Sequence, residues 1–453
     1  SKEILLGEFN SWMKNQAVPN ELNTALIKLL PKTERGLADL NAVRPIALME
    51  CLVKTYEQIV IGRTLNILLK NKVLDLSQYG AIPKSGVFAP LRILAEVIND
   101  AVKHDRDLHL MVADLSKAFD TMEYWSQEMS WQALGMPQEM INILVNLDQG
   151  DTDQGGGATS SVSIARGAAT KPFKHGRGVR QGSVGGPLKW VVFVHFWLAW
   201  VKTEMKGKGY EMAAIATQRT LNPQHELSEV TKDTAETVGM MFVDDSIWCA
   251  RTAAGMQEMA EMHTTFCEFH KVNLHKTKSE YHSHLSKRSR TSNAQVHWPA
   301  QEEGDLNATP KPTTLPKVEN REDIRSIATT RVQSAAALSQ EQTLGKVIQD
   351  QKDKPFKYLG VWFSMNGSWE AQIEEMQKKH AANLEALNKT KAPLKQVVMA
   401  INTKAIPQML YPLQVAVVPI STTKKWDSEL KATVAKAAGM AAVSRPLTYF
   451  SAW

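Results

Sequence analysis

Two short stretches of sequence decide the fold: HLMVAD at residues 109–114 and GMMFVDDS at residues 239–246. Each contains an apolar run of strand length that ends on acidic side chains, Asp114 in the first and Asp244 and Asp245 in the second. Short apolar runs bounded by polar residues are typical of buried strands. We therefore expect two adjacent strands that carry these three carboxylates at their tips.

Carboxylates in this arrangement point to a metal site. Mg²⁺ prefers hard oxygen ligands in near-octahedral geometry, and two such ions can activate a hydroxyl group and support a departing oxygen. Three crowded carboxylates repel one another without cations, so metal binding explains their presence. Either acid taken alone has a second interpretation, which is a cap at the junction of a strand and a turn.

Other motifs stand in a fixed order around these acids. GVRQGS at 178–183, followed by GGP at 185–187, lies between the two stretches, and NLHKTK at 273–278 and FKYLG at 356–360 come after them. This succession resembles the reverse transcriptase family, specifically the non-LTR retrotransposon branch with its group II intron relatives. The resemblance runs from about Leu26 to the C-terminus and is interrupted near 282–354.

The resemblance implies an α+β fold shaped as a right-hand polymerase, with fingers, a palm whose antiparallel sheet carries the acids, and a helical thumb. It assigns the fingers to 1–108 and 121–180, and the palm to 109–120 and 181–281. A polar insertion occupies 282–354, a primer-grip hairpin of the palm 355–367, and the helical thumb 368–453. The thumb segment holds eleven Lys and Arg against six Asp and Glu, which suits contacts with a phosphate backbone.

The implied activity is that of an RNA-directed DNA polymerase, which extends a primer 3′-hydroxyl with dNTPs by two-metal-ion nucleotidyl transfer. Asp114, Asp244 and Asp245 match the family's ligands for two Mg²⁺ ions, with Mn²⁺ as a substitute. Lys276 matches a lysine that protonates the leaving pyrophosphate or stabilises its charge. Lys278 is a rival for that role, and the sequence does not separate the two.

Five further residues match positions around the incoming nucleotide. Lys32 and Arg44 correspond to cations that grip the triphosphate, since phosphate requires positive donors. Phe119 corresponds to a bulky side chain that would clash with a ribose 2′-hydroxyl, although core packing is a second interpretation. Gln181 and Gly182 correspond to residues that line the nascent base pair, where a Gly allows the backbone to approach closely.

Tyr358, Leu359 and Gly360 resemble the primer grip. The sequence departs from the family after Gln181 in two ways. Val184-Gly185-Gly186-Pro187 replaces a small apolar pair and Ser-Pro, and Lys189 stands where an apolar residue is common.

The insertion has few aromatic residues and several Pro, Ser and Thr. We expect 282–320 to be a surface segment and 321–350 to be weakly helical. Its basic run Lys287–Arg290 either contacts nucleic acid or is a solvated loop. A short linker in place of 282–320 is therefore expected to leave the fold intact.

Composition indicates a large folded chain and permits a nucleic-acid partner. The 453 residues are 43% apolar with a net charge of +6, which permits such a partner without requiring one. Three cysteines give neither a disulfide framework nor a zinc pattern. The longest apolar run, Trp190–Val201, is too short to span a bilayer and predicts a buried helix.

The expected partners are an RNA template, a DNA or RNA primer and dNTPs, with a ribonucleoprotein as a further assembly and no membrane. We expect an intracellular location, nuclear or cytoplasmic, with an organelle as an alternative. Since Ser1 is not a natural start residue, a processed product or a fragment is expected. Two other functions stay open: a retroelement-derived RNA-binding or structural component of a ribonucleoprotein, and a template-directed RNA polymerase, against which Phe119 argues.

Overall fold

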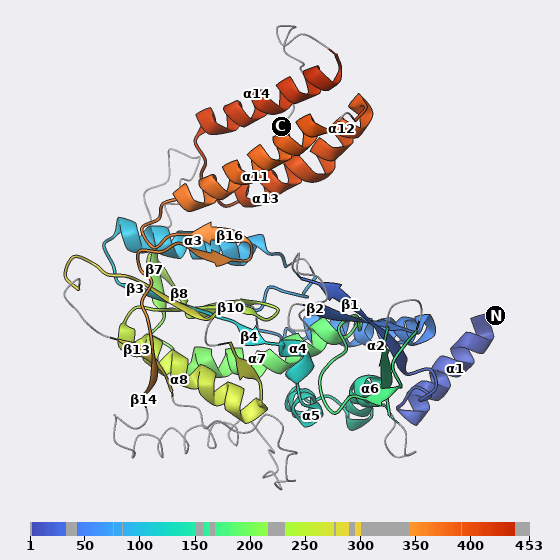
Figure 1. Cartoon of the computed structure of the whole chain (residues 1–453). Coiled ribbons are helices and arrows are strands. Elements are labelled where there is room, and N and C mark those ends of the chain that lie inside the picture. The colour runs from blue at the N-terminus through green and yellow to red at the C-terminus, as the bar shows by residue number, and fades with distance from the viewer. Residues whose placement is uncertain are drawn as a thin grey trace, which may run out of the picture. The chain divides into compact units, whose positions relative to one another are not determined.

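The computed structural model describes most of the chain and divides it into two compact units. The described residues are 2–32, 43–75, 77–83, 85–150, 157–163, 168–215, 232–275, 278–289, 295–299, 344–390 and 392–439. The first unit comprises Ser1–Gly86, His109–Tyr281 and Ser292–Asp350, and the second comprises Val87–Leu108, His282–Thr291 and Gln351–Trp453. Figure 1 labels most of their helices and strands.

The two acid-tipped strands lie in one antiparallel sheet, with a third strand between them. Its order is β12-β3-β10-β9, with β3 at Leu108–Ala113, β9 at Gly239–Phe242, β10 at Asp245–Ala250 and β12 at Glu280–His284. Both strands expected from the sequence, β3 and β9, are present, but they are not adjacent as expected, because β10 lies between them and pairs with each. Ser246 of β10 lies opposite Ala113 of β3. Asp114 follows Ala113 and Asp245 precedes Ser246, so the two acids meet at the same end of this sheet.

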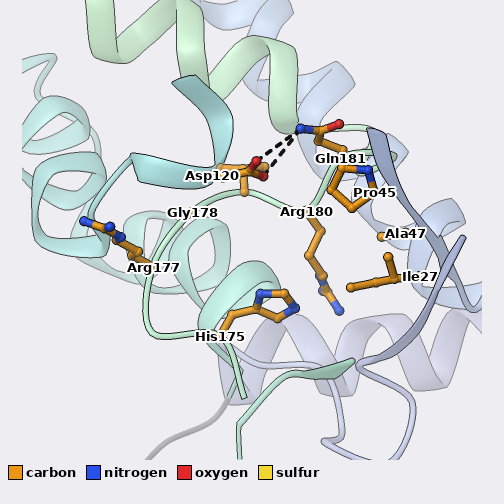
Figure 2. Close-up of a pocket in the computed structure, with 10 residues that line it drawn as sticks. Ile27, Pro45, Ala47, Asp120, His175, Arg177, Gly178, Arg180 and Gln181 are labelled. Carbon is orange, nitrogen blue, oxygen red and sulfur yellow. Dashed lines mark hydrogen bonds between the residues drawn. The ribbon is translucent and has the colours of Figure 1, made fainter. Parts of the chain in front are cut away.

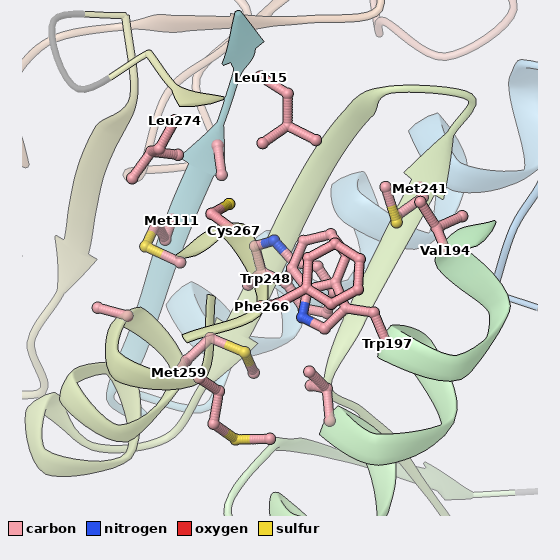
Figure 3. Packing of buried hydrophobic residues seen from close by; sticks show 14 of the residues in the cluster. Met111, Leu115, Val194, Trp197, Met241, Trp248, Met259, Phe266, Cys267 and Leu274 are labelled. Atoms are coloured by element: carbon pink, nitrogen blue, oxygen red, sulfur yellow. The ribbon is translucent and has the colours of Figure 1, made fainter. Parts of the chain in front are cut away.

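Two helices cover one face of this sheet. They are α7 at Gly186–Glu204 and α8 at Ala253–His270. Trp197 of α7 packs against Trp248 of β10 and Phe266 of α8, with ring centroids 4.7 and 4.8 Å apart (Figure 3). The Trp190–Val201 run is therefore a buried helix, as expected. None of the helices in the described part of the chain combines the length and apolar content needed to cross a bilayer.

A second sheet in the same unit has the order β2-β1-β5-β6. Strands β1 and β2 form an antiparallel pair in which Leu30 lies opposite Arg44. The four strands are Thr24–Pro31, Val43–Met49, Thr159–Val162 and Phe173–Lys174. A second apolar core joins β1 and β2 to five helices: α7 and also α1 at Lys2–Asn15, α2 at Cys51–Lys70, α5 at Tyr124–Ala133 and α6 at Gln138–Gln149.

Short elements complete the first unit. Helix α4 at Ala118–Thr121 follows β4 at Leu115–Ser116, which pairs with β11 at Asn273–Leu274. A separate hairpin pairs β7 at Tyr210–Ile215 with β8 at Lys232–Thr237.

The second unit is mainly helical. Helix α3 at Phe88–Lys103 and a hairpin of β15 at Phe356–Tyr358 and β16 at Val361–Phe363 belong to it. The other helices are α11 at Glu370–Lys389, α12 at Leu394–Ala400, the π-helical η4 at Ile401–Ala405, α13 at Ile406–Leu413 and α14 at Ile420–Ala437. Met376, Met409 and Trp426 form one of its apolar clusters and join α11, α13 and α14.

The expectation for the segment between β12 and β15 is wrong at its ends. β13 at Val296–Pro299 pairs with β14 at Leu344–Ile348, so 344–348 is a strand and not weakly helical. Val296 and Trp298 are buried in the core that contains α8. An apolar pair spaced two apart in a polar segment is the signal of a half-buried strand, and it lies inside the stretch that was expected to be a surface segment. Residues 300–343 lie outside the described part of the chain.

Candidate active site

The three carboxylates lie close enough to influence one another. Burial, together with the smaller effects of the charges of Asp244 and Asp114, raises the pKa of Asp245 to about 6. Burial is also the main cause of the raised pKa of Asp244, with Asp114 adding to it and Arg44 opposing it. Neighbouring carboxylates that repel one another favour either a proton or a cation between them. The donor chemistry of these three residues therefore suits a divalent metal ion.

The carboxylates do not converge fully on one point in this structure. Among the described residues no group of three or more His, Cys, Asp and Glu side chains is placed so that it could hold a metal ion. Lys278 instead approaches Asp114, with 3.6 Å between its Nζ and a carboxylate oxygen. Lys276 lies outside the described residues.

The turn that carries Asp244 has an unusual backbone. Phe242 and Asp245 are paired across the hairpin, so Val243 and Asp244 form a two-residue connection between β9 and β10. Val243 has a φ of +59°, a value that β-branched residues rarely adopt. Strained backbone at such a position persists only when its surroundings hold it.

The expected triphosphate cations lie in the same unit as the acids. Arg44 and Lys32 are exposed, and Arg44 lies on β2 whereas Lys32 follows β1 directly. The charge of Arg44 lowers the pKa of Asp244, and that of Lys32 lowers the pKa of Asp120, although burial raises both overall. Both cations therefore lie within electrostatic reach of carboxylates that neighbour the candidate site.

Phe119 and Gln181 are linked through Asp120. Phe119 is half-buried on α4, and its ring packs against Trp190 with 5.5 Å between centroids. The next residue, Asp120, accepts long hydrogen bonds of 3.4 and 3.5 Å from the Gln181 side chain. Both interpretations of Phe119 thus remain: part of its ring is in the core, and part is accessible.

Gln181 also lines a pocket of about 210 Å³, shown in Figure 2. The lining residues are Ile27, Pro45, Ala47, Asp120, His175, Arg177, Gly178, Val179, Arg180 and Gln181. Gly182 beside it has a φ of +116°, and a Cβ there would lie 2.6 Å from the Ala47 carbonyl oxygen. The loop after Gly178 therefore docks against β2 in a way that only Gly permits.

Comparison with known families identifies the family of the chain. The profile of the family described as reverse transcriptase (RNA-dependent DNA polymerase) matches residues 30–363, which is more than half of the chain and includes all three acids. The chain belongs to the reverse transcriptase family. The family predicted from the motifs is confirmed, and so is the mixed α and β architecture of a reverse transcriptase domain. The boundaries of fingers, palm and thumb stay predictions.

Two retrotransposon proteins resemble this reverse transcriptase in sequence. The Retrovirus-related Pol polyprotein from a type-2 retrotransposable element of Drosophila melanogaster is 28% identical over 177 residues, 39% of this chain and 15% of the relative. The corresponding polyprotein from a type-1 retrotransposable element of Nasonia vitripennis is 24% identical over 256 residues, 56% of this chain and 21% of the relative. These relatives support the non-LTR retrotransposon type. The chain spans a minor part of the length of each.

Telomerase structures are also similar to this reverse transcriptase. An apo telomerase of Candida tropicalis truncated from its C-terminal domain has a TM-score of 0.40 and 14% identity, covering 65% of this chain and 57% of its own. Telomerase of Candida albicans in complex with the TWJ fragment of telomeric RNA has a TM-score of 0.43 and 9% identity, covering 95% and 62%.

The positions at which the chain departs from the family pattern contact structural partners that are distant in the sequence. The buried Glu57 of α2 accepts hydrogen bonds from the Ser183 hydroxyl and from the backbone N–H groups of Val184 and Gly185. A Cβ at Gly185 would lie 2.9 Å from the Glu57 carboxylate. The small residues before α7 thus make room for a carboxylate from a distant helix.

Arg180 and Lys189 are likewise explained by buried partners. Arg180 donates hydrogen bonds to the backbone and side-chain oxygens of Asn23 and to the Leu147 carbonyl. Lys189 forms a fully buried ion pair with Asp148, with 2.5 Å between Nζ and Oδ2. Both residues anchor the scaffold behind the candidate site.

The expected primer-grip residues form a tight turn in the second unit. Leu359 and Gly360 connect β15 to β16 with φ values of +45° and +83°, as in the two-residue turns that suit hairpins. The Tyr411 hydroxyl of α13 donates a 2.5 Å hydrogen bond to the Leu359 carbonyl. Tyr358 is buried and Gly360 is exposed, so the turn backbone, and not the Tyr358 ring, is accessible to a ligand.

Proposed function

We propose that this chain is an RNA-directed DNA polymerase from a retroelement, which extends a primer 3′-hydroxyl with dNTPs. The observation that carries the proposal is the meeting of Asp114 with Asp244 and Asp245 at one end of a sheet, within a domain of the reverse transcriptase family. A protein that only binds RNA has no physical need for three crowded, partly desolvated carboxylates.

In this proposal Asp114, Asp244 and Asp245 hold two divalent ions, Mg²⁺ or Mn²⁺. When bound, the metal ions activate the primer 3′-hydroxyl and offset the charge of the departing pyrophosphate. Arg44 and Lys32 bind the triphosphate, which is consistent with their exposure and their charge beside the acids. Lys276 supplies a proton or a positive charge to the leaving pyrophosphate, with Lys278 as its rival.

The other predicted roles follow the same frame. Gln181 and Gly182 line the nascent base pair, and Phe119 contacts the sugar of the incoming nucleotide. Residues Tyr358–Gly360 support the primer end. We assign the acid-bearing sheet to a palm, the β1–β2 hairpin to fingers, and the α11–α14 helices to a thumb, with an RNA template and a DNA or RNA primer as partners.

The proposal is tested by Asp114→Asn and Asp244→Asn in a primer-extension assay on an RNA template with Mg²⁺. Metal charge stabilises the transition state by several kcal/mol, so each variant should lose about 1,000-fold or more in rate, equivalent to about 4 kcal/mol. Binding of template and primer should change little, because it depends on distributed basic contacts.

Asp427→Asn is the matched control, since it makes the same change on the surface helix α14, where Asp427 pairs with Lys431. It should extend primers at the wild-type rate. Wild-type extension rates in Asp114→Asn or Asp244→Asn would contradict the assignment of these acids. A wild-type protein that binds RNA and never extends a primer would favour the ribonucleoprotein alternative.

A further inference from the structure

The turn that presents Asp244 is held by a residue that none of the motifs includes. Gln78 lies in the connection between α2 and α3, and only 2% of its surface is exposed. The chain around it runs alongside β9: the Tyr79 N–H donates to the Met241 carbonyl and the Met241 N–H donates to the Ser77 carbonyl, both at 2.8 Å. Residues 77–79 therefore act as an additional, short strand at the edge of the acid-bearing sheet.

The Gln78 side chain reaches from this edge to the turn itself. Its Oε1 accepts a 2.9 Å hydrogen bond from the Val243 N–H, and its Nε2 donates a 3.1 Å hydrogen bond to the Val243 carbonyl. One amide thus satisfies both backbone polar groups of the residue that directly precedes Asp244. The same Oε1 accepts from the Gly80 N–H at 2.8 Å, which fixes the orientation of the amide.

Two further contacts close around the same residue. The Trp190 indole N–H donates a 2.8 Å hydrogen bond to the Val243 carbonyl. A Cβ at Gly80 would lie 2.5 Å from both Val243 Cγ2 and Val243 N, so only Gly permits this approach. The surroundings therefore leave Val243 little freedom to leave its positive φ.

The contacts around Val243 fix the geometry of the turn. A two-residue hairpin connection with a positive φ at its first position ordinarily has Gly there, whereas this chain has Val. The unfavourable conformation persists because the Gln78 amide, the Trp190 indole and the Gly80 backbone compensate for it. Side chains at Asp244 and Asp245 take their direction from this turn.

We propose that Gln78 is a positioning residue for the metal-binding carboxylates and sets the conformation of the turn that aims Asp244 and Asp245. The inference rests on the proposed function, since it assigns Gln78 to the same metal site. Gln78 touches neither metal nor substrate and acts through the Val243 backbone. Partners that orient metal ligands in this way typically change metal affinity or activity by about 10–100-fold when they are removed.

The test compares Gln78→Met with Gln127→Met in the full chain. Methionine keeps the length and volume of glutamine and removes its hydrogen bonds. Gln127 is a matched control: it is buried in α5, and its amide has no hydrogen-bond partner among the described residues. The two measurements are Mn²⁺ binding by electron paramagnetic resonance and the Mg²⁺ concentration that gives half-maximal primer extension.

We expect Gln78→Met to weaken Mn²⁺ binding at least about 10-fold and to raise the Mg²⁺ requirement, with KM for template-primer unchanged. Gln127→Met should match the wild type. Adding Val243→Gly to Gln78→Met should recover part of the metal affinity, because Gly adopts a positive φ without strain. Where Gln78→Met does not fold, Gln78→Glu serves, since it keeps the acceptor, loses the N–H donor and sets a carboxylate oxygen against the Val243 carbonyl; its Mg²⁺ requirement should also rise.

The outcomes distinguish a failure of the inference about Gln78 from a failure of the proposed function. Wild-type protein that binds Mn²⁺ and extends primers, together with a Gln78→Met variant that does both equally well, overturns the role of Gln78 alone. Wild-type protein that neither binds Mn²⁺ nor extends primers overturns the proposed function and this inference with it. An equal loss in Gln78→Met with and without Val243→Gly shows that Gln78 does not act through the turn.

Discussion

At the scale of single residues, the Phe119 side chain has two interpretations: it packs in the core, and it contacts the sugar of the incoming nucleotide. Its ring packs against Trp190 and is still half-exposed beside Asp120 and Gln181. If the accessible part occupies the space of a ribose 2′-hydroxyl, Phe119→Ala should admit ribonucleotides and Phe119→Tyr should not. The measurement is the ratio of kcat/KM for dNTP over rNTP in primer extension, which should fall at least about 10-fold, equivalent to about 1.4 kcal/mol. An unchanged ratio with lowered thermal stability would leave only the packing role.

The buried pair of Lys189 and Asp148 belongs to the scale of elements, because it joins α7 to α6. Breaking a buried ion pair leaves one charge without compensation and costs about 3–5 kcal/mol, whereas replacing both partners with apolar residues is often neutral or stabilising. We expect Lys189→Met to lower the free energy of unfolding by that amount. The double variant Lys189→Met/Asp148→Leu should lie near the wild type or above it in urea denaturation.

Lys389→Met provides the comparison for this prediction. Lys389 pairs with Glu385 on α11, and both side chains are mostly exposed, so the pair is worth about 0.5 kcal/mol or less. A loss in Lys189→Met no greater than that in Lys389→Met would show that the pair of α6 and α7 is not desolvated in solution.

At the scale of the whole molecule, the segment between β13 and β14 is the test of how much chain the fold needs. Pro299 and Leu344 are partners in this strand pair, so the described residues on either side of 300–343 lie next to each other. That stretch contains no Phe, Trp or Tyr. Replacing 301–342 with a Gly/Ser linker of about four residues, within the usual length of hairpin loops, should leave the melting temperature and basal primer extension nearly unchanged.

Composition alone predicts that a short linker can also replace 282–320, but the structure indicates that this larger replacement destabilises the protein. It removes Val296 and Trp298, which are buried in the core with α8. Losing a buried Trp alone costs about 3–5 kcal/mol, a large fraction of the stability of an ordinary domain. Soluble, fully folded protein after this larger replacement would show that β13 is dispensable, and unfolding after the replacement of 301–342 would show that the connection itself is structural.

The sequence by itself determined the local elements and the family. The two acid-tipped strands and the buried helix over Trp190–Val201 were predicted from patterns within about twelve residues, and each is present. Such patterns are legible because apolar periodicity and chain-terminating polar residues act on neighbouring positions. The order of the motifs then identified the reverse transcriptase family.

Only the tertiary structure decided which distant side chains support the candidate site. Gln78 reaches Val243 across 165 positions of sequence, and Glu57 reaches Ser183 across 126. No local pattern marks such residues, because a buried polar group is stable only when the fold brings it a hydrogen-bond partner. The same reason explains Lys189, which departs from the family pattern and is stable at its buried position because the fold brings Asp148 against it.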